Sequence, residues 1–187
     1  MTALAGPPGA GKSFLAAALA QKLNTADPGS AAVVPMDGFH LDDTVLEARG
    51  LRARKGAPET FDTGGLAAVL ARLSANTDAE IAIPLFDRRL EIARAGAAVI
   101  PQAVRHIIIE GNYLLLARPP WHGLHRFFTT TVMLKAADEV LRRRLAARWE
   151  AAGLDAAAVR AKVEENDLVS ARYVTEESVE AEIWVGE

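Results

Sequence analysis

Eight residues near the start of the chain have the types and spacing of a loop that binds nucleotide phosphates. They are Gly6, Pro7, Pro8, Gly9, Ala10, Gly11, Lys12 and Ser13. Glycines permit a turn in which several backbone N–H groups converge on one anion, the lysine reaches the outer phosphates, and the serine hydroxyl binds magnesium. A helix predicted to follow the loop would add its N-terminal amides. The sequence therefore predicts a site for a nucleoside triphosphate and Mg²⁺. The next residue, Phe14, is predicted to contact the nucleotide as well.

A second candidate group follows the apolar run at residues 31–36. Asp37 stands just beyond the carboxyl end of this predicted strand, at the edge where open α/β sheets bind ligands. A carboxylate there can accept the proton of an attacking hydroxyl or hold magnesium through water, and Asp-Gly is also a common turn. We expect a catalytic role for Asp37. His40 could contact a substrate or hydrogen-bond the turn.

A second acidic residue, Glu110, follows the apolar run 107–109 in the same way. Proteins with a phosphate loop commonly place a magnesium-linked acid at this point, usually Asp, and the longer Glu can reach the ion directly or through water. The alternative is a carboxylate that simply faces solvent. We predict that Glu110 and Ser13 bind magnesium.

Four arginines lie on one predicted helix, residues 137–149. Arg144 and Arg148 are four residues apart and so face the same way. Arginine binds phosphate bidentately, so either residue could neutralise charge on a phosphoryl group during its transfer. A solvated basic helix face is the competing interpretation.

These groups are carried by alternating strand and helix patterns. Strands are predicted at 2–5, 31–36, 81–85, 105–109, 131–134 and 181–185, and helices at 13–23, 65–73, 137–149 and 155–163. Such alternation is typical of parallel strands joined by crossover helices. The predicted fold class is α/β, a three-layer α/β/α P-loop fold with a mainly parallel central sheet. The 187 residues suffice for one domain, 1–187.

Composition narrows the function further. The chain has no cysteine, a net charge of −3 and no apolar run long enough to span a bilayer, and Met1 leads straight into the first strand without an export signal. We therefore expect a cytoplasmic protein that acts on neither nucleic acid nor membrane, because an acidic chain lacks the basic surface that nucleic acids require. The partner expected is a small-molecule acceptor, and a homodimer is one option for the oligomeric state.

The remaining motifs separate the classes of phosphate-loop proteins. The segment 62–65 fits the Asp-x-x-Gly pattern of GTPases, but no Asn-Lys-x-Asp motif follows, and the Leu-Ser-Gly-Gly-Gln motif of transport ATPases is absent. Read in order from residue 4 to about 174, the motifs resemble those of the phosphoribulokinase, uridine kinase and pantothenate kinase superfamily. The resemblance is strongest to bacterial proteins labelled fructose transport system kinases or nucleoside/nucleotide kinase-like proteins. The motifs are the phosphate loop and residues 37–40, 55–62, 83–88 and 109–113.

The resemblance implies a role for each matching position. Asp37 falls where these kinases place the base, Glu110 on their acid near magnesium, and Arg144 and Arg148 on a helical lid, about 142–160, that closes on ATP. An excursion at about 38–104 would hold the acceptor, the molecule that receives the phosphoryl group. Its matching residues are Asp37, His40, Lys55, Phe61, Asp62, Asp87 and Arg88, joined by Asn112 and Tyr113. Lys55, Asp62, Asp87 and Arg88 could equally form salt bridges between loops.

The function predicted is ATP-dependent, magnesium-requiring phosphorylation of a hydroxyl on a small metabolite such as a sugar, nucleoside or vitamin-like molecule. Lys12, Asp37, Arg144 and Arg148 would be the catalytic residues. The main alternative is a regulatory or assembly switch that binds ATP, hydrolyses it slowly and has no small acceptor. A nucleic-acid 5′-hydroxyl kinase is the third, which the acidic net charge disfavours.

Overall fold

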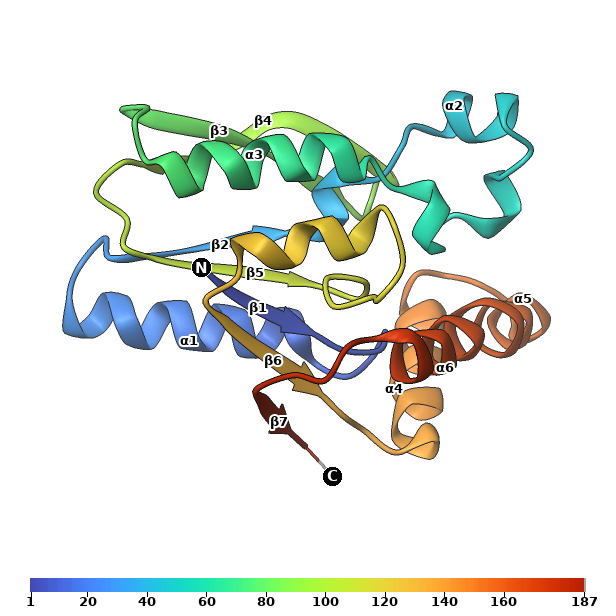
Figure 1. Ribbon diagram of the computed structural model, residues 1–187. Helices are drawn as coiled ribbons and strands as arrows, with labels where there is room; N and C mark the ends of the chain where they lie inside the picture. The colour runs from blue at the N-terminus through green and yellow to red at the C-terminus, as the bar shows by residue number, and fades with distance from the viewer. Residues whose placement is uncertain (187) are drawn as a thin grey trace.

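Five parallel strands form the central sheet of the computed structural model, which describes residues 1–186 (Figure 1). The spatial order is β2-β5-β1-β6-β7. The bounds are β1 Thr2–Ala5, β2 Ala31–Pro35, β5 His106–Gly111, β6 Thr130–Leu134 and β7 Ile183–Val185. Parallel pairing holds for each of the four neighbouring pairs, so the prediction of a mainly parallel α/β sheet is confirmed.

Alternate residues of the central strands face two separate hydrophobic cores. Ala3 and Ile109 belong to a core on one face, whereas Leu4 and Ile108 belong to a core on the other. Successive side chains of a strand point to opposite faces, and a parallel sheet covered on both sides reads as a continuous apolar run. The three isoleucines before Glu110 suit this arrangement, because side chains on both faces of β5 are buried. Burial on both faces also favours one register of β5 against its neighbouring strands.

Helices cover both faces of the sheet (Figure 1). Helix α1 (Lys12–Ala26) lies along one face, and α3 (Thr63–Ala75) and the 3₁₀ segment η4 (Trp121–Phe127) lie on the other. The lid lies beyond the carboxyl ends of the central strands. We use this word for α4 (Asp138–Ala151), α5 (Ala156–Ala161), the π-helical segment η5 (Lys162–Asp167) and α6 (Leu168–Glu177). No helix within residues 1–186 is both long enough and apolar enough to cross a membrane.

One predicted strand lies outside the central sheet. The run at 81–85 is part of β3 (Glu80–Asp87), which pairs antiparallel with β4 (Ile92–Pro101) in a separate two-stranded sheet. The connection has only four residues, 88–91, and so short a link permits an antiparallel hairpin but no parallel crossover. This hairpin lies next to α3 (Figure 1).

The segment between β2 and α3 is built from short elements. They are the 3₁₀ turns η1 (Met36–Phe39), η2 (Arg52–Arg54) and η3 (Pro58–Thr60) and the helix α2 (Asp43–Ala48). Asp42 caps α2 by accepting a hydrogen bond from the Thr44 amide at 2.9 Å. η1 follows β2 directly and packs against the β3–β4 hairpin and β5.

Candidate active site

The phosphate loop joins β1 to α1, and its glycines adopt backbone angles that other residues rarely do. The φ angle is 82° at Gly9 and 99° at Gly11, and Gly11 is the N-cap of α1. A Cβ added to Gly9 would lie 3.1 Å from Cγ of Leu145 on α4. Glycine at this position therefore lets the lid pack directly on the loop.

Lys12 and Ser13 connect the loop to its surroundings. The Lys12 ammonium donates a hydrogen bond to the Pro7 carbonyl at 2.9 Å, so the side chain folds back over the loop. Burial lowers the pKa of Lys12 to about 8, although Glu110 and Asp37 act to raise it. The Ser13 hydroxyl donates to Oε1 of Glu110 at 3.0 Å.

Glu110 and Ser13 form a donor set that suits Mg²⁺. Glu110 is the penultimate residue of β5 and is only 7% exposed, and its pKa is raised by burial and by the nearby charge of Asp37. A hydroxyl and a carboxylate beside a phosphate loop are the kinds of oxygen ligand that Mg²⁺ takes together with phosphate oxygens and water. A cation here would also offset the repulsion between the two carboxylates.

Asp37 is the second residue of η1, the 3₁₀ turn that begins directly after β2. Its Oδ2 forms an ion pair with Nη2 of Arg88 at 2.5 Å. Burial acts to raise the pKa of this carboxyl, but His40, Arg88 and Lys12 outweigh burial and hold the pKa below its ordinary value. Asp37 is therefore ionised at neutral pH, as a proton acceptor must be.

Gly38 explains how the hairpin comes so close to Asp37. A Cβ added to Gly38 would lie 2.3 Å from the carbonyl oxygen of Pro84 in β3. Only glycine leaves room for the backbone of β3 at this point, and Arg88 follows directly after that strand. The Asp-Gly pair is thus a packing requirement as well as a turn.

The His40 ring is packed between two aromatic rings. Its centroid lies 4.1 Å from that of Phe61 and 4.6 Å from that of Phe86. Burial lowers the pKa of His40, so the ring is neutral at pH 7. Nδ1 lies 2.8 Å from the Asp37 carbonyl oxygen, which can only accept, so Nδ1 carries the hydrogen and Nε2 is left as an acceptor.

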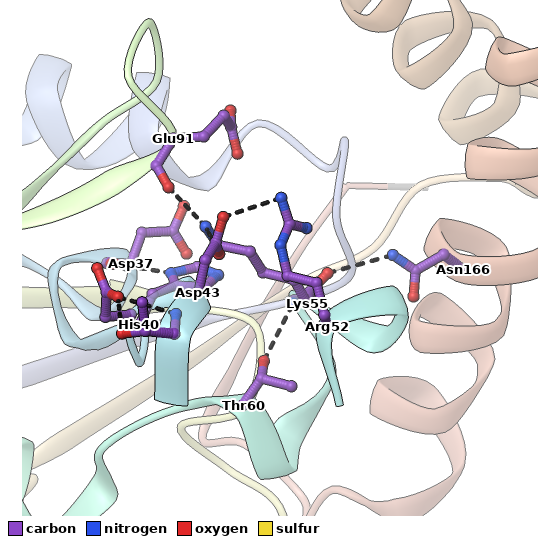
Figure 2. A network of polar contacts seen from close by, with 11 residues as sticks. Asp37, His40, Asp43, Arg52, Lys55, Thr60, Glu91 and Asn166 are labelled. Atoms are coloured by element: carbon purple, nitrogen blue, oxygen red, sulfur yellow. Dashed lines mark hydrogen bonds and ion pairs between the residues drawn. The ribbon is translucent and has the colours of Figure 1, made fainter. Parts of the chain in front are cut away.

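Lys55 links two other segments of the excursion, through Asp43 and Glu91 (Figure 2). Its ammonium donates to Oδ1 of Asp43 at 2.6 Å and to the carbonyl oxygen of Glu91 at 2.5 Å. Asp43 also pairs with Arg52 at 2.8 Å. The expectation that Lys55 and Arg88 could form salt bridges between loops is therefore met, yet both side chains also border the cavity described next.

A cavity of about 310 Å³ lies between the phosphate loop, the excursion and the lid, and we call it the acceptor pocket. It brings together many of the residues predicted from sequence, which are Pro8, Asp37, His40, Lys55, Phe61, Arg88, Asn112 and Arg148. Its volume is within the range of pockets that hold small organic molecules. Pro8 of the phosphate loop and Asp37 thus border the same cavity.

Other predicted residues have structural contacts and do not line this pocket. Oδ1 of Asp62 accepts the Gly65 amide at 2.8 Å and caps α3. Asp87 accepts the Arg89 amide at 3.0 Å, and the fully buried Tyr113 donates its hydroxyl to the Gly56 carbonyl at 2.6 Å. Asp87 also pairs with Arg94 at 3.4 Å, as its salt-bridge alternative expected, whereas Asp62 acts as a helix cap.

Phe14 and the lid arginines occupy distinct positions near the loop. Phe14 projects from α1 with 81% of its surface exposed. Nη1 of Arg144 donates to the carbonyl oxygens of Gly9 at 3.2 Å and Ala10 at 3.4 Å, whereas Arg148 borders the acceptor pocket. The two arginines therefore face the loop and the pocket, respectively.

The lid contributes pocket residues that the sequence prediction missed. Lys162, Asn166 and Ser170 line the acceptor pocket, together with Trp149, Leu154 and Asp167. Three residues of the excursion were missed as well, namely Arg52, Phe86 and Glu91. Lys162, Asn166 and Ser170 recur at intervals of four, which places polar side chains on one helix face and could have indicated a site. Nδ2 of Asn166 donates to the Lys55 carbonyl at 3.4 Å (Figure 2).

Known proteins show a consistent likeness to this chain, although no protein-family model matches it. "Putative uridine kinase C227.14" of Schizosaccharomyces pombe is 32% identical, with 96% of this chain and 80% of that protein covered. The pantothenate kinase of Myxococcus xanthus is 32% identical over 75% of this chain and 46% of its own length. The chain thus spans most of the first relative and about half of the second.

Solved structures agree with these relatives. A crystal structure of a "putative fructose transport system kinase" from Silicibacter sp. TM1040 superposes with a TM-score of 0.92 at 42% identity, covering 99% of this chain and 88% of that one. The YFH7 protein of Saccharomyces cerevisiae shares the fold with a TM-score of 0.86 at 18% identity, over 98% of this chain and 91% of that one. Together with the phosphate loop, these likenesses show an ATP-dependent kinase, and the chain belongs to the P-loop kinase superfamily of phosphoribulokinase, uridine kinase and pantothenate kinase.

Proposed function

We propose that this kinase transfers the γ-phosphoryl group of ATP to a hydroxyl of a small metabolite. The observation that carries the proposal is the cavity that Asp37 shares with Pro8 of the phosphate loop and with Arg148 of the lid. An ionised carboxylate at the edge of a phosphate site is placed to accept a proton from an attacking hydroxyl. A protein that only hydrolysed ATP would not need the polar and aromatic side chains that line the acceptor pocket.

Each step of the transfer has a residue to support it. The loop amides and Lys12 hold the phosphates. The acceptor oxygen attacks the γ-phosphorus, and the bond between the γ-phosphorus and the oxygen bridging it to the β-phosphate breaks. The hydroxyl proton passes to Asp37, and ADP leaves. Ser13 and Glu110 would hold Mg²⁺, which when bound neutralises charge on the phosphate oxygens. Arg144 and Arg148 of the lid offset further charge as the transfer proceeds.

The pocket lining supports a sugar, nucleoside or vitamin-like acceptor. Nε2 of His40 accepts a hydrogen bond, Asn112 can donate and accept, and the rings of Phe61 and Phe86 present apolar faces. Mixed linings of this kind orient a polar molecule within an apolar cleft. The names of the relatives, which refer to uridine, pantothenate and fructose, are consistent with this class.

A screen of acceptors tests the proposal. Purified protein with ATP and Mg²⁺ is offered sugars, nucleosides and vitamins while ADP release is followed, and each hit is verified by the mass of the phosphorylated product. We expect ADP release that depends on one class of acceptor. Binding of ATP with no acceptor-dependent turnover across the panel would refute the proposal and favour a regulatory switch.

A further inference from the structure

A second cavity, of about 730 Å³, lies behind the segment that forms one wall of the acceptor pocket. It is bounded by residues 53–59, by the turn at 118–121 and by lid residues between 154 and 173. Its volume is within the range of sites that enclose small organic ligands. Transfer of a phosphoryl group to a small polar molecule does not by itself require this space.

Only a thin wall separates the second cavity from the acceptor pocket. Lys55 and Gly56 face the acceptor pocket, while their neighbours Arg54 and Ala57 face the second cavity. The hydrogen bond from Asn166 to the Lys55 carbonyl, 3.4 Å long, closes this wall from the lid side (Figure 2). A bond of that length is weak, so a ligand group could replace it. Four residues line both cavities, namely Leu154, Lys162, Asn166 and Ser170.

The chemistry of the second cavity differs from that of the acceptor pocket. Its walls are largely aromatic and aliphatic, formed by Pro119, Pro120, Trp121, Leu154, Val169 and Tyr173. Such walls favour an aromatic or branched aliphatic group, because its burial removes apolar surface from water.

The charged residues at the rim are mostly paired already. Arg54 pairs with Glu59 at 2.6 Å, and Arg118 pairs with Glu177 at 2.8 Å. Within residues 1–186, neither Lys162 nor Glu165, which also lines the second cavity, forms an ion pair. Lys162 stands where the two cavities meet, with its Nζ 5.5 Å from the centroid of the Trp149 ring. An anionic or hydrogen-bond-accepting group of a ligand would suit this junction.

We infer that the two cavities form one extended site, in which the second cavity receives the distal, apolar part of the acceptor. The acceptor is then a molecule with a hydroxyl-bearing polar head near Asp37 and an aromatic or branched aliphatic body beyond Lys55. A free sugar would fill only the first part. This inference rests on the proposed kinase function, and it narrows the substrate class to amphipathic hydroxyl compounds.

Paired acceptors and a filled cavity test the inference. Free sugars are compared with the phenyl glycosides of the same sugars, in wild-type protein and in Val169→Trp, with ADP release and product mass as readouts. Val169 lines the second cavity and is 51% exposed, so the larger ring can be built without disturbing the core. Val45→Trp is the matched control, because Val45 is 37% exposed on α2 and lines neither cavity.

For any sugar that the wild-type protein phosphorylates, we expect the phenyl glycoside to have a KM about tenfold or more below that of the free sugar. Val169→Trp should remove this advantage and leave the KM of the free sugar within about twofold, because Val169 lines the second cavity and not the acceptor pocket. Equal KM values for both members of each pair, or equal effects of Val169→Trp on both, would overturn the inference while the kinase function stands.

Binding of 8-anilinonaphthalene-1-sulfonate, an aromatic anion whose fluorescence rises in apolar sites, separates the two failures. Suppose no compound is phosphorylated, but this probe binds wild-type protein and Val45→Trp and not Val169→Trp. The kinase proposal then fails, and the second cavity is a ligand site of another kind, which also overturns its assignment to the acceptor.

Discussion

The carboxylate of Asp37 and the guanidinium of Arg88 form an ion pair of 2.5 Å that joins the end of β2 to the turn after β3. The two residues are 51 positions apart in the chain. With His40 and Lys12, Arg88 holds the pKa of Asp37 below its ordinary value, and the ion pair engages Oδ2 of the carboxylate. The Arg88 side chain is 51% exposed, so it has room to shift away from Asp37.

Replacing Arg88 tests this relationship through pH dependence. Arg88→Gln removes a positive charge that lowers the pKa of Asp37, so this pKa rises and burial acts unopposed by Arg88. A base works only when deprotonated, so the acid limb of kcat/KM should move to higher pH. Arg89→Gln, the neighbouring exposed arginine, should leave the limb in place. Coinciding acid limbs for wild type and Arg88→Gln would contradict the account.

Lys12 predicts a loss of ATP affinity at alkaline pH. Burial sets the pKa of Lys12 at about 8 in the free protein, and the phosphates bind the protonated form. The dissociation constant of ATP should therefore be constant near pH 7 and rise above pH 8, approaching about tenfold per pH unit. Calorimetric titration from pH 7 to 9.5 at fixed ionic strength measures it. Lys12→Met should bind weakly and without this dependence, and a flat wild-type profile would refute the assignment.

The lid arginines are expected to affect turnover more than nucleotide binding. Arg144→Ala removes contacts to the loop carbonyls, and Arg148→Ala removes a cation from the acceptor pocket. Each should lower kcat by about tenfold or more, because a positioned arginine stabilises the transition-state charge. Arg142→Ala is the control on the same helix, because Arg142 pairs with Glu164 at the surface. If kcat is unchanged and only ATP affinity falls, the arginines are anchors.

Tyr113 is expected to stabilise the wall of the acceptor pocket. Its buried hydroxyl donates to the Gly56 carbonyl, and Tyr113→Phe would leave that oxygen without its partner. The free energy of unfolding should fall by about 1 to 2 kcal/mol, while ATP affinity stays the same. Chemical denaturation and calorimetry measure the two quantities. Tyr173→Phe, a partly buried tyrosine of the second cavity, is the matched control.

The sequence predicted the features that depend on local spacing. The phosphate loop is contiguous, the strands β1, β2, β5 and β6 are short apolar runs, and the arginine helix has its buried leucines at a spacing of four. Asp37, His40, Lys55 and Arg88 were predicted at the acceptor site and do line the pocket. The catalytic role of Asp37 and the acceptor-binding roles of all four residues stay predictions.

Features that depend on distant contacts were harder to predict. β4 was missed because Arg94 and Gly96 interrupt its pattern, and β3 was placed in the wrong sheet because an apolar run does not reveal its partner. The ion pair of Asp37 and Arg88 depends on the close packing of the hairpin against Gly38, which the sequence pattern does not reveal. Asn166 was missed for the same reason, since its partner Lys55 lies 111 residues away.

The most direct test of the account is acceptor-dependent ADP release by wild-type protein and by Asp37→Asn, measured with ATP binding in the same preparations. Asp37→Asn keeps the shape of the side chain and removes its basicity. We expect acceptor-dependent turnover to fall by roughly a hundred- to ten-thousandfold, with ATP affinity preserved. Asp78→Asn, at an exposed pair with Arg72, should be unaffected. Unchanged turnover in Asp37→Asn, with ATP still bound, would contradict the central claim that Asp37 accepts the proton of the attacking hydroxyl.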